Sequence, residues 1–287
     1  MTAQVFDVVV IGAGIVGAAI ARDLAGTSLS VAVIEARNDV GDGTSKANTA
    51  LLHTGYDATP GTLESRLVAR GYHLLGDYAA QAGLPVERTG AILVAWTGEE
   101  LQALPALKDK AERNGYHDCC AISAAEVYRQ VPDLGSGALG GLTVPGESII
   151  CTWTTNLALA TDAVRRGATL LREHAVTGAD VADGVTLVHT SRGDITARWV
   201  INAAGLGADW IDQEFGYHRF TVTPRRGELL VFDKLARPLA PRVVLPVPSS
   251  RGKGGPDQPH HLRQRDARTH FRRPPGPNGH GYLAVRL

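Results

Sequence analysis

The N-terminal segment alternates apolar runs with a turn of small residues, in an order that predicts a strand, a helix and a second strand. Residues 5–11 (VFDVVVI) form a β-branched run of buried-strand length. A glycine-rich turn follows, and apolar residues then recur at helical spacing at Ile15, Ala18, Ala19, Ala21 and Leu24. A second apolar run at 31–34 ends in Glu35. These segments together predict a β-α-β module.

The rest of the chain mixes helical and strand-like patterns without an internal repeat. We expect helices at 62–80, 99–113, 124–130 and 156–166. Strands are expected at 88–96, 169–172 and 185–190, from 199 towards 207, and within 220–232. A chain of 287 residues with this alternation predicts one large α/β domain or two interleaved ones.

Three glycines in the first turn carry a candidate binding site for a dinucleotide. Gly12, Gly14 and Gly17 have the spacing GxGxxG, which permits a tight turn, close approach of a pyrophosphate, and close packing of helix on strand. Glu35, at the end of the second strand, can accept both hydroxyls of an adenosine ribose and would repel a 2′-phosphate. A glycine turn without a ligand is the alternative. The match of strand, turn, helix and carboxylate favours the nucleotide.

The segment 41–71 (GDGTSKANTALLHTGYDATPGTLESRLVARG) resembles the FAD-dependent glycerol-3-phosphate dehydrogenases and the L-2-hydroxyglutarate oxidases. In those families a small polar turn leads into a helix and then into H-[ST]-G beside the flavin ring. The resemblance implies that Thr44, Ser45 and Asn48 contact the pyrophosphate or the flavin. It also implies that His53, Thr54 and Gly55 lie at the isoalloxazine, where an imidazole can accept a substrate proton. A histidine satisfied within its own loop is the alternative for His53.

Two later segments extend the resemblance. WVINAAGLGADWI, at 199–211, is similar to the second FAD-contacting strand and turn of this superfamily, which implies that Ala204 and Gly205 lie against the cofactor. TPRRGELLVF, at 223–232, resembles the start of a strand in the substrate domain. Arg225 and Arg226 there could hold a phosphate or a carboxylate through their guanidinium groups. Solvation at the surface is the alternative for either arginine.

The resemblance implies an α/β architecture and a redox reaction. A Rossmann-like FAD-binding domain (1–83 and 147–214) would be interleaved with a mixed-sheet substrate domain (84–146 and 215–250). The implied function is FAD-dependent oxidation of a secondary alcohol, sn-glycerol 3-phosphate to dihydroxyacetone phosphate, with electrons passing to a quinone or another acceptor. A 2-hydroxy-acid oxidase is the first alternative, so the substrate is a phosphorylated polyol or a hydroxy acid. An inactive remnant of such an enzyme is the second.

Composition and charge limit the partners, metal sites and cellular compartment that we expect for the protein. Residues from 251 onward hold eight Lys or Arg against two Asp or Glu, so the remaining chain has a net charge of −6, which does not suit a nucleic-acid partner. The three cysteines show neither CxxC nor metal-ligand spacing, and we expect no metal site. The first residues lack a secretory signal pattern, so we expect a cytoplasmic protein. Peripheral contact with the inner face of the membrane stays open.

The segment 251–287 departs from the family pattern. It is rich in Pro, Arg and His, cannot bury a core, and is expected to be disordered. Back-translated from Gly255 and read one base later, it permits VLISPTIYGNVMLGPT, which is an apolar strand, a turn, and a strand ending in the family's GPT. We therefore predict that the reading frame shifts near Gly254, leaving the substrate domain incomplete. A divergent tail in the original frame is the alternative.

Overall fold

The computed structural model describes residues 5–182, 184–224, 227, 229–248 and 285–286. The chain divides into two compact units, each built from two stretches. Unit 1 comprises Met1–Asn48 and Cys151–Arg226, and unit 2 comprises Thr49–Ile150 and Gly227–Leu287. The assignment of 1–83 and 147–214 to FAD and of 84–146 and 215–250 to substrate stays a prediction about which residues contact which molecule.

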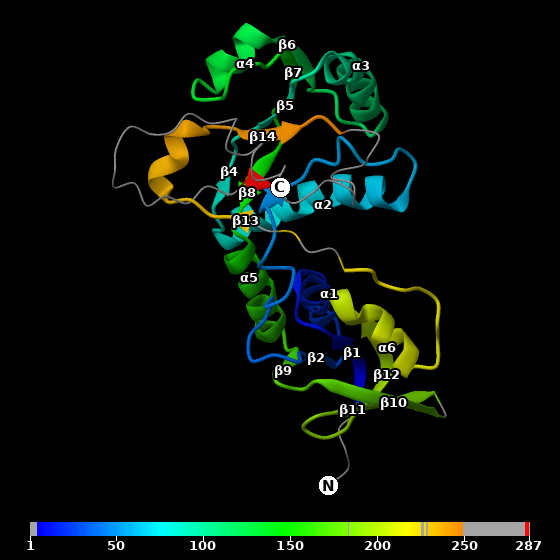
Figure 1. Ribbon diagram of the computed structural model, residues 1–287. Coiled ribbons are helices and arrows are strands. Elements are labelled where there is room, and N and C mark those ends of the chain that lie inside the picture. The colour runs from blue at the N-terminus through cyan, green and yellow to red at the C-terminus, as the bar shows by residue number, and fades with distance from the viewer. Residues whose placement is uncertain (1–4, 183, 225–226, 228, 249–284, 287) are drawn as a thin grey trace. The chain divides into compact units, whose positions relative to one another are not determined.

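Unit 1 is built on a six-stranded sheet in the order β10-β11-β12-β1-β2-β9 (Figure 1). Strands β12, β1, β2 and β9 run parallel, while β10 and β11 form an antiparallel hairpin that continues the sheet from β12. The strands are β1 (Val5–Ile11), β2 (Val31–Ile34), β9 (Thr169–Leu171), β10 (Val176–Ala182), β11 (Val185–Thr190) and β12 (Ile195–Asn202). The N-terminal β-α-β module predicted from the sequence is confirmed.

One hydrophobic cluster of unit 1 joins the sheet to helix α6 (Ala208–Glu214). All four residues of β2 are buried, as expected for a short apolar strand in the middle of a parallel sheet. Val9 and Ile11 from β1 pack in the same cluster as Ile211 from α6. Burial of these side chains stabilises the part of the sheet that carries the glycine turn.

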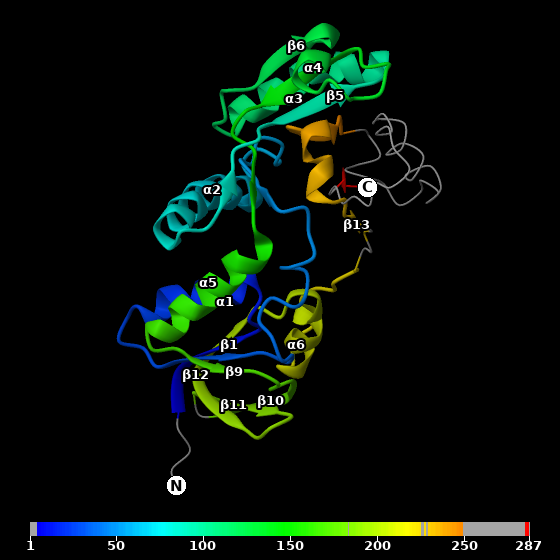
Figure 2. The same cartoon turned by 90° about the vertical axis from the view of Figure 1, so that its left-hand side faces the viewer.

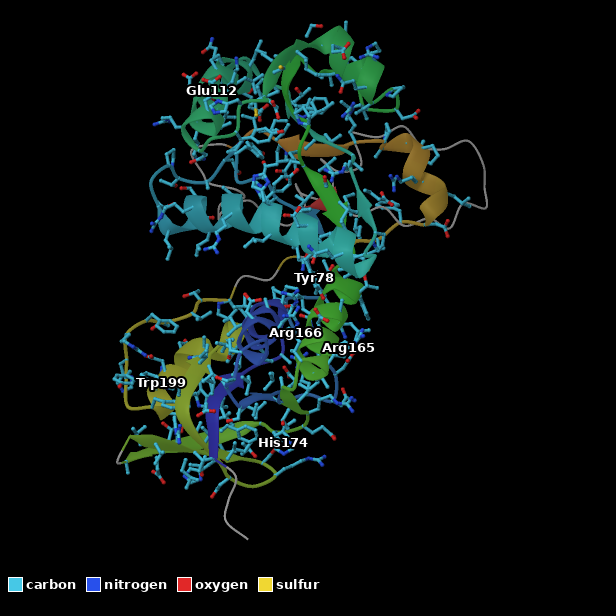
Figure 3. All side chains as sticks on the ribbon, turned by 180° about the vertical axis from the view of Figure 1, so that it is seen from behind. Tyr78, Glu112, Arg165, Arg166, His174 and Trp199 are labelled. Atoms are coloured by element: carbon cyan, nitrogen blue, oxygen red, sulfur yellow. The ribbon has the colours of Figure 1, made fainter. Side chains whose placement is uncertain are left out.

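Helices α1 (Ile15–Ala25) and α5 (Thr152–Arg165) pack against each other in unit 1 (Figures 1 and 2). Small buried residues on both helices, among them Ala18 and Ala160, allow this close approach. Arg22 Nε donates to Asp162 Oδ2 across the pair at 2.8 Å. Figure 3 shows Arg165 and Arg166 at the C-terminal end of α5, where positive charge suits the helix dipole.

The described residues of unit 2 form three small sheets and three α-helices. Its four-stranded sheet has the order β14-β5-β7-β6, with β14 parallel to β5 and the other pairs antiparallel. A three-stranded antiparallel sheet has the order β3-β8-β4, and β13 pairs with β15. The strands are β3 (Leu51–Leu52), β4 (Val86–Glu87), β5 (Ala91–Ala95), β6 (Cys120–Ser123), β7 (Gly140–Val144), β8 (Ser148–Ile150), β13 (Leu229–Leu230), β14 (Val243–Pro246) and β15 (Val285–Arg286).

The helices of unit 2 begin at side-chain caps that the sequence supplies. Thr62 accepts the amide of Ser65 at the start of α2 (Leu63–Ala82), and Gly83 ends that helix in the left-handed conformation. Thr97 and Glu100 form a reciprocal capping box at α3 (Gly98–Arg113). Helix α4 (Ala124–Gln130) starts at the Ser123 cap. The predicted helices at 62–80, 99–113 and 124–130 are therefore confirmed within two residues at each end.

One expectation about local structure is wrong, and one strand that was predicted correctly has different bounds. The resemblance implied a helix between the polar turn at Gly41 and His53, but residues 39–48 form turns and bends. Asn48 Nδ2 donates to the carbonyls of Thr44 and Ser45, and such short polar side chains compete with helical hydrogen bonding. The strand expected from residue 199 starts earlier, at Ile195, and ends at Asn202, since the chain then enters a 3₁₀ turn, η1 (Gly205–Gly207). A second 3₁₀ segment, η2, spans Lys234–Leu239.

None of the helices in the described part of the chain is long and apolar enough to cross a membrane.

Candidate functional site

The glycine turn of unit 1 brings three stretches of backbone into close contact. Gly12 has φ 101°, and a Cβ there would lie 2.6 Å from the carbonyl oxygen of Ala203. A Cβ on Gly17 would lie 1.9 Å from the carbonyl oxygen of Gly12. Any side chain at these two positions would force α1 away from β1 or β1 away from the end of β12. Both glycines therefore serve the packing of strand, turn and helix.

Gly14 differs from the other two glycines because the space beside it is open towards a side chain. A Cβ on Gly14 would meet only Ser45 Oγ, at 3.1 Å. Gly14 is also the N-cap of α1, where amide groups point out of the helix and favour an anion. Ser45 Oγ accepts the amide of Ile15 at 2.9 Å, so the predicted contact residue Ser45 lies at the helix start.

Glu35 lies at the carboxyl end of β2, as the sequence predicts for a ribose acceptor. Its Oε2 accepts the amide of Ala13 at 2.8 Å, and its Oε1 accepts the amide of Arg37 at 2.9 Å. These two bonds fix the carboxylate beside the glycine turn, and each oxygen keeps a further lone pair for a hydroxyl. We call Gly12, Gly14, Gly17, Glu35 and Ser45 the dinucleotide cradle.

Asn156 supports the cradle and was not predicted from the sequence. It lies fully buried on α5, and its Nδ2 donates to the carbonyl of Ala13 at 3.1 Å. Its amide group also packs on Gly41, whose Cβ would lie 2.7 Å from Asn156 Cγ. An asparagine next to the apolar run LALA of a helix was the available signal, but its partner is 143 positions away in the sequence.

The other residues predicted to contact the cofactor from unit 1 lie in turns. Thr44 and Asn48 are joined by a side-chain bond to the backbone within the turn after Gly41. Ala204 donates its amide to Asn202 Oδ1 at the end of β12, and Gly205 follows with φ 58° and open space where a Cβ would stand. That these residues contact FAD stays a prediction.

The cradle fits an adenine dinucleotide such as FAD. The open position at Gly14, the amides at the start of α1 and the anchored carboxylate of Glu35 match a pyrophosphate and a ribose in turn. Filling the space at Gly14 with a side chain would remove the room for the pyrophosphate. Among the described residues, no three His, Cys, Asp or Glu side chains are grouped as a metal site requires.

The H-T-G sequence predicted to lie at the flavin follows β3 in unit 2. Thr54 is buried, and both its amide and its hydroxyl donate to Glu147 Oε1, at 2.8 and 2.7 Å. His53 Nδ1 lies 3.1 Å from the same oxygen, and His53 Nε2 lies 3.2 Å from Asp57 Oδ1. We call His53, Thr54, Asp57 and Glu147 the His53 cluster. The structure thus joins two predicted residues, His53 and Thr54, to two that were not predicted.

The His53 cluster changes the ionisation of its imidazole. Burial alone disfavours the charged ring and lowers its pKa, but hydrogen bonds and charges from Asp57 and Glu147 outweigh it and raise the pKa from 6.5 to about 9. His53 is therefore an imidazolium at neutral pH in the chain without ligand. The side chain remains 31% exposed, so it is accessible from solvent while both ring nitrogens have partners.

A set of side-chain to backbone bonds fixes the loop that carries the His53 cluster. Asn114 Nδ2 donates to the carbonyls of Gly55, Tyr56 and Ala58, at 3.2, 3.1 and 2.8 Å. Gly146, which precedes Glu147 in the connection between β7 and β8, donates its amide to the hydroxyl of Tyr116. Burial raises the pKa of Tyr116 to about 12, so it stays a neutral partner. The predicted substrate arginines, Arg225 and Arg226, lie outside the described residues.

Comparison with known proteins agrees with these features. The family model of the FAD-dependent oxidoreductases matches residues 7–280. The chain is 34% identical over 249 residues to the glycerol 3-phosphate dehydrogenase of Caloramator mitchellensis, covering 87% of this chain and 52% of that protein. It is 29% identical over 261 residues to the mitochondrial L-2-hydroxyglutarate dehydrogenase of Homo sapiens, covering 86% of this chain and 56% of that protein. The chain therefore spans about half the length of these relatives.

Solved structures share the fold. The L-alpha-glycerophosphate oxidase of Mycoplasma pneumoniae with FAD bound superposes with a TM-score of 0.83 at 24% identity, over 99% of this chain and 72% of that one. The glycine oxidase of Geobacillus kaustophilus gives a TM-score of 0.76 at 23% identity, over 86% of this chain and 69% of that one. The predicted α/β architecture and the FAD cofactor are confirmed. The chain belongs to the family of FAD-dependent oxidoreductases.

Proposed function

We propose that this protein oxidises the secondary alcohol of sn-glycerol 3-phosphate to dihydroxyacetone phosphate. The observation that carries the proposal is the 34% identity to a glycerol 3-phosphate dehydrogenase over 249 residues. The dinucleotide cradle and the His53 cluster supply the two parts such a reaction needs, a place for FAD and an acid-base group. Electrons then pass to a quinone or another acceptor, which is compatible with peripheral contact at the membrane.

Bound FAD would supply the hydride acceptor for the alcohol carbon. The residues of this chain then have separate tasks. The cradle would hold the pyrophosphate at the start of α1 and the ribose at Glu35, and His53, in its neutral form, would remove the hydroxyl proton of the substrate. His53, Thr54 and Gly55 would contact the flavin, as the resemblance implies, and Arg225 and Arg226 would hold the phosphate of the substrate.

The test is a comparison of substrates on two purified proteins, the 287-residue chain and a version whose alternative reading frame is restored from codon 255. FAD content is measured by absorbance after gel filtration, and turnover is followed with an artificial acceptor dye on glycerol 3-phosphate, L-2-hydroxyglutarate and glycerol. We expect the restored version to oxidise glycerol 3-phosphate and little glycerol, and the 287-residue chain, with its substrate domain incomplete, to hold little FAD. A chain that retains FAD but oxidises none of the three alcohols would show an inactive remnant and sink the proposal.

Variants of Arg225 and Arg226 test whether the protein binds the phosphate of the substrate. Replacing Arg225 and Arg226 by alanine should raise KM for glycerol 3-phosphate by two orders of magnitude or more, because two charge-assisted contacts are worth about 3 to 6 kcal/mol. KM for glycerol should stay unchanged. The matched double lysine variant should retain part of the affinity, since it keeps the charge and loses the forked geometry. Equal effects on both substrates would remove the phosphate role.

A 2-hydroxy acid is the second candidate substrate, favoured by the 29% identity to the human L-2-hydroxyglutarate dehydrogenase. The same arginines would then hold a carboxylate. A higher kcat/KM for L-2-hydroxyglutarate than for glycerol 3-phosphate would establish this alternative.

The nucleotide sequence of the gene around codon 254 tests the predicted frame shift separately. The family match extends to residue 280, within the segment concerned. Nucleotides that lack the predicted reading VLISPTIYGNVMLGPT one base later would refute the shift.

A further inference from the structure

Glu147 is a charged residue with no exposed surface. It lies in the connection between β7 and β8, and its relative exposure is 0%. Burial of a carboxylate is costly unless partners compensate it, so its retention at this position calls for a specific set of contacts. Nothing in the pattern of strands around it requires an acid, because β7 and β8 contain only glycine, serine, threonine and aliphatic residues.

The two oxygens of Glu147 differ in what they contact. Oε1 accepts the amide and the hydroxyl of Thr54 and lies 3.1 Å from His53 Nδ1. Oε2 is buried without a hydrogen-bond partner among the described residues. Structural support of the Thr54 backbone would need only neutral acceptors, which an amide side chain also provides. Of the groups that contact Glu147, only the imidazole of His53 requires its negative charge.

Two neighbours compete for His53 Nδ1. The amide of Gly55 lies 3.1 Å away and can donate to it only when Nδ1 carries a lone pair. Glu147 Oε1 lies at the same distance and can accept from it only when Nδ1 carries a proton. The lone pairs of Nδ1 and a buried carboxylate oxygen would repel each other at this separation, and the charged oxygen gives the stronger interaction. We therefore favour a proton on Nδ1, donated to Glu147.

The opposite side of the ring is less firmly held. Asp57 Oδ1 lies 3.2 Å from Nε2, within the same loop as His53, and Tyr56 packs on the imidazole with ring centroids 5.4 Å apart. Asp57, Glu147 and Tyr56 are the titratable groups that the described residues place against the ring. Glu147 is anchored by two bonds to Thr54 from a different part of the chain. The fixed partner is thus on Nδ1, and the partner on Nε2 comes from the same loop as His53.

We propose that Glu147 is a positioning residue that fixes the proton on His53 Nδ1, so that Nε2 is the atom that exchanges a proton with the alcohol substrate. The inference rests on the proposed role of His53 in alcohol oxidation. The neutral ring, with Nδ1–H donated to Glu147, takes the hydroxyl proton at Nε2, and FAD, when bound, would accept the hydride of the alcohol carbon. The O–H and C–H bonds break as the carbonyl forms, and Nε2 later returns its proton to solvent. In the chain without substrate, Asp57 Oδ1 lies beside Nε2, so the proposal requires the substrate hydroxyl to replace it there.

The test follows the His53 ring in the 287-residue chain without substrate. The chain is labelled with ¹⁵N-histidine, the His53 signals are assigned by their loss in the His53→Gln variant, and both ring nitrogens are titrated by NMR. Above the pKa of the ring, the nitrogen shifts distinguish a proton on Nδ1 from one on Nε2. We expect the Nδ1–H form in the wild-type chain. A neutral ring that carries its proton on Nε2 would overturn the proposal.

Variants separate charge from structural support. Glu147→Gln keeps an acceptor for Thr54 and removes the charge, so the Nε2–H form should gain and the acid dissociation constant of His53 should rise about tenfold or more, one unit of pKa. Thr54→Val is the matched control, because it removes a bond to Glu147 and keeps the charge, and the Nδ1–H form should persist. Should Glu147→Gln fail to fold, Glu147→Asp tests the same point by shortening the side chain. An unchanged ring in Glu147→Gln or Glu147→Asp would refute the proposal.

Failure of the inference and failure of the proposed function give different results. A chain that shows the Nδ1–H ring and its loss in Glu147→Gln, yet oxidises no alcohol, would retain the positioning of His53 and lose the assigned reaction. An active enzyme in which the His53 ring is unchanged by Glu147→Gln would support the reaction and refute the positioning role of Glu147.

Discussion

The dinucleotide cradle of unit 1 and the His53 cluster of unit 2 are built by opposite means. The cradle depends on the lack of side chains at Gly12 and Gly17, because backbone atoms occupy the space that a side chain would take. The His53 cluster depends on charge, since a fully buried carboxylate and a second acid surround one imidazole. The cradle should therefore be insensitive to pH and be disrupted by any substitution that adds side-chain volume. The His53 cluster should be sensitive to pH and tolerate a change of side chain better when the charge is kept.

The largest effect is expected from Gly17→Ala, which adds one methyl group. Its Cβ would lie 1.9 Å from the carbonyl oxygen of Gly12, so helix or strand must move, at a cost of about 3 kcal/mol in unfolding free energy. Urea denaturation followed by circular dichroism measures the loss. The matched Gly14→Ala variant meets only Ser45 Oγ at 3.1 Å, so it should fold almost normally and bind FAD more weakly. Equal stability of the two variants would contradict this account of the cradle.

Glu147→Ala should come next, with a loss of about 2 kcal/mol in unfolding free energy. It leaves the amide and hydroxyl of Thr54 without their acceptor and an imidazolium without its buried counter-charge. Chemical denaturation at neutral pH measures this loss. The isosteric Glu147→Gln variant should recover part of it. If alanine and glutamine behave alike, the bonds to Thr54 contribute nothing.

The pH dependence of stability follows from the raised pKa of His53. The folded ring has a pKa of about 9 against 6.5 for an ordinary histidine, so between these values the folded chain holds a proton that the unfolded chain has released. The resulting stabilisation, roughly 1 to 3 kcal/mol after allowance for solvent screening, is complete below pH 6.5 and is lost as the pH rises through 9. Unfolding measured at pH 6 and pH 10 should show this fall in the wild-type chain. It should be absent in His53→Gln.

Glu35→Gln should give the smallest effect of the four. Glutamine keeps an acceptor for Ala13 and loses the charge that strengthens bonds to the ribose, so FAD affinity should fall about tenfold, or ~1.4 kcal/mol. Titration of the apoprotein with FAD, followed by flavin fluorescence, measures the change. The dissociation constant should not depend on pH between 6 and 9, in contrast to the His53 cluster. A dissociation constant for FAD that changes steeply with pH would contradict this difference between the cradle and the His53 cluster.

The sequence predicted what local patterns determine. The β-α-β module, the glycine spacing and the capped helices α2 and α3 depend on neighbouring residues, and each was found within a few positions of its prediction. Asn156 and Glu147 escaped prediction, because they act on residues 143 and 93 positions away. The glutamate of VPGE was a polar residue between two apolar strands, which is a weak sign by itself. Its partner could be found only once β3 and β8 were paired.

The pairing of β1 with β12 also governs when unit 1 can form. Asp7 and Arg198, bonded at 3.0 Å, are 191 positions apart, and the whole first stretch of unit 2 lies between them. At ribosomal rates of 5–20 residues per second, β1 waits roughly ten to forty seconds for its neighbour to emerge. During synthesis the glycine turn is therefore made before the strand that supports it. We expect flavin capture in this protein to follow translation of β12.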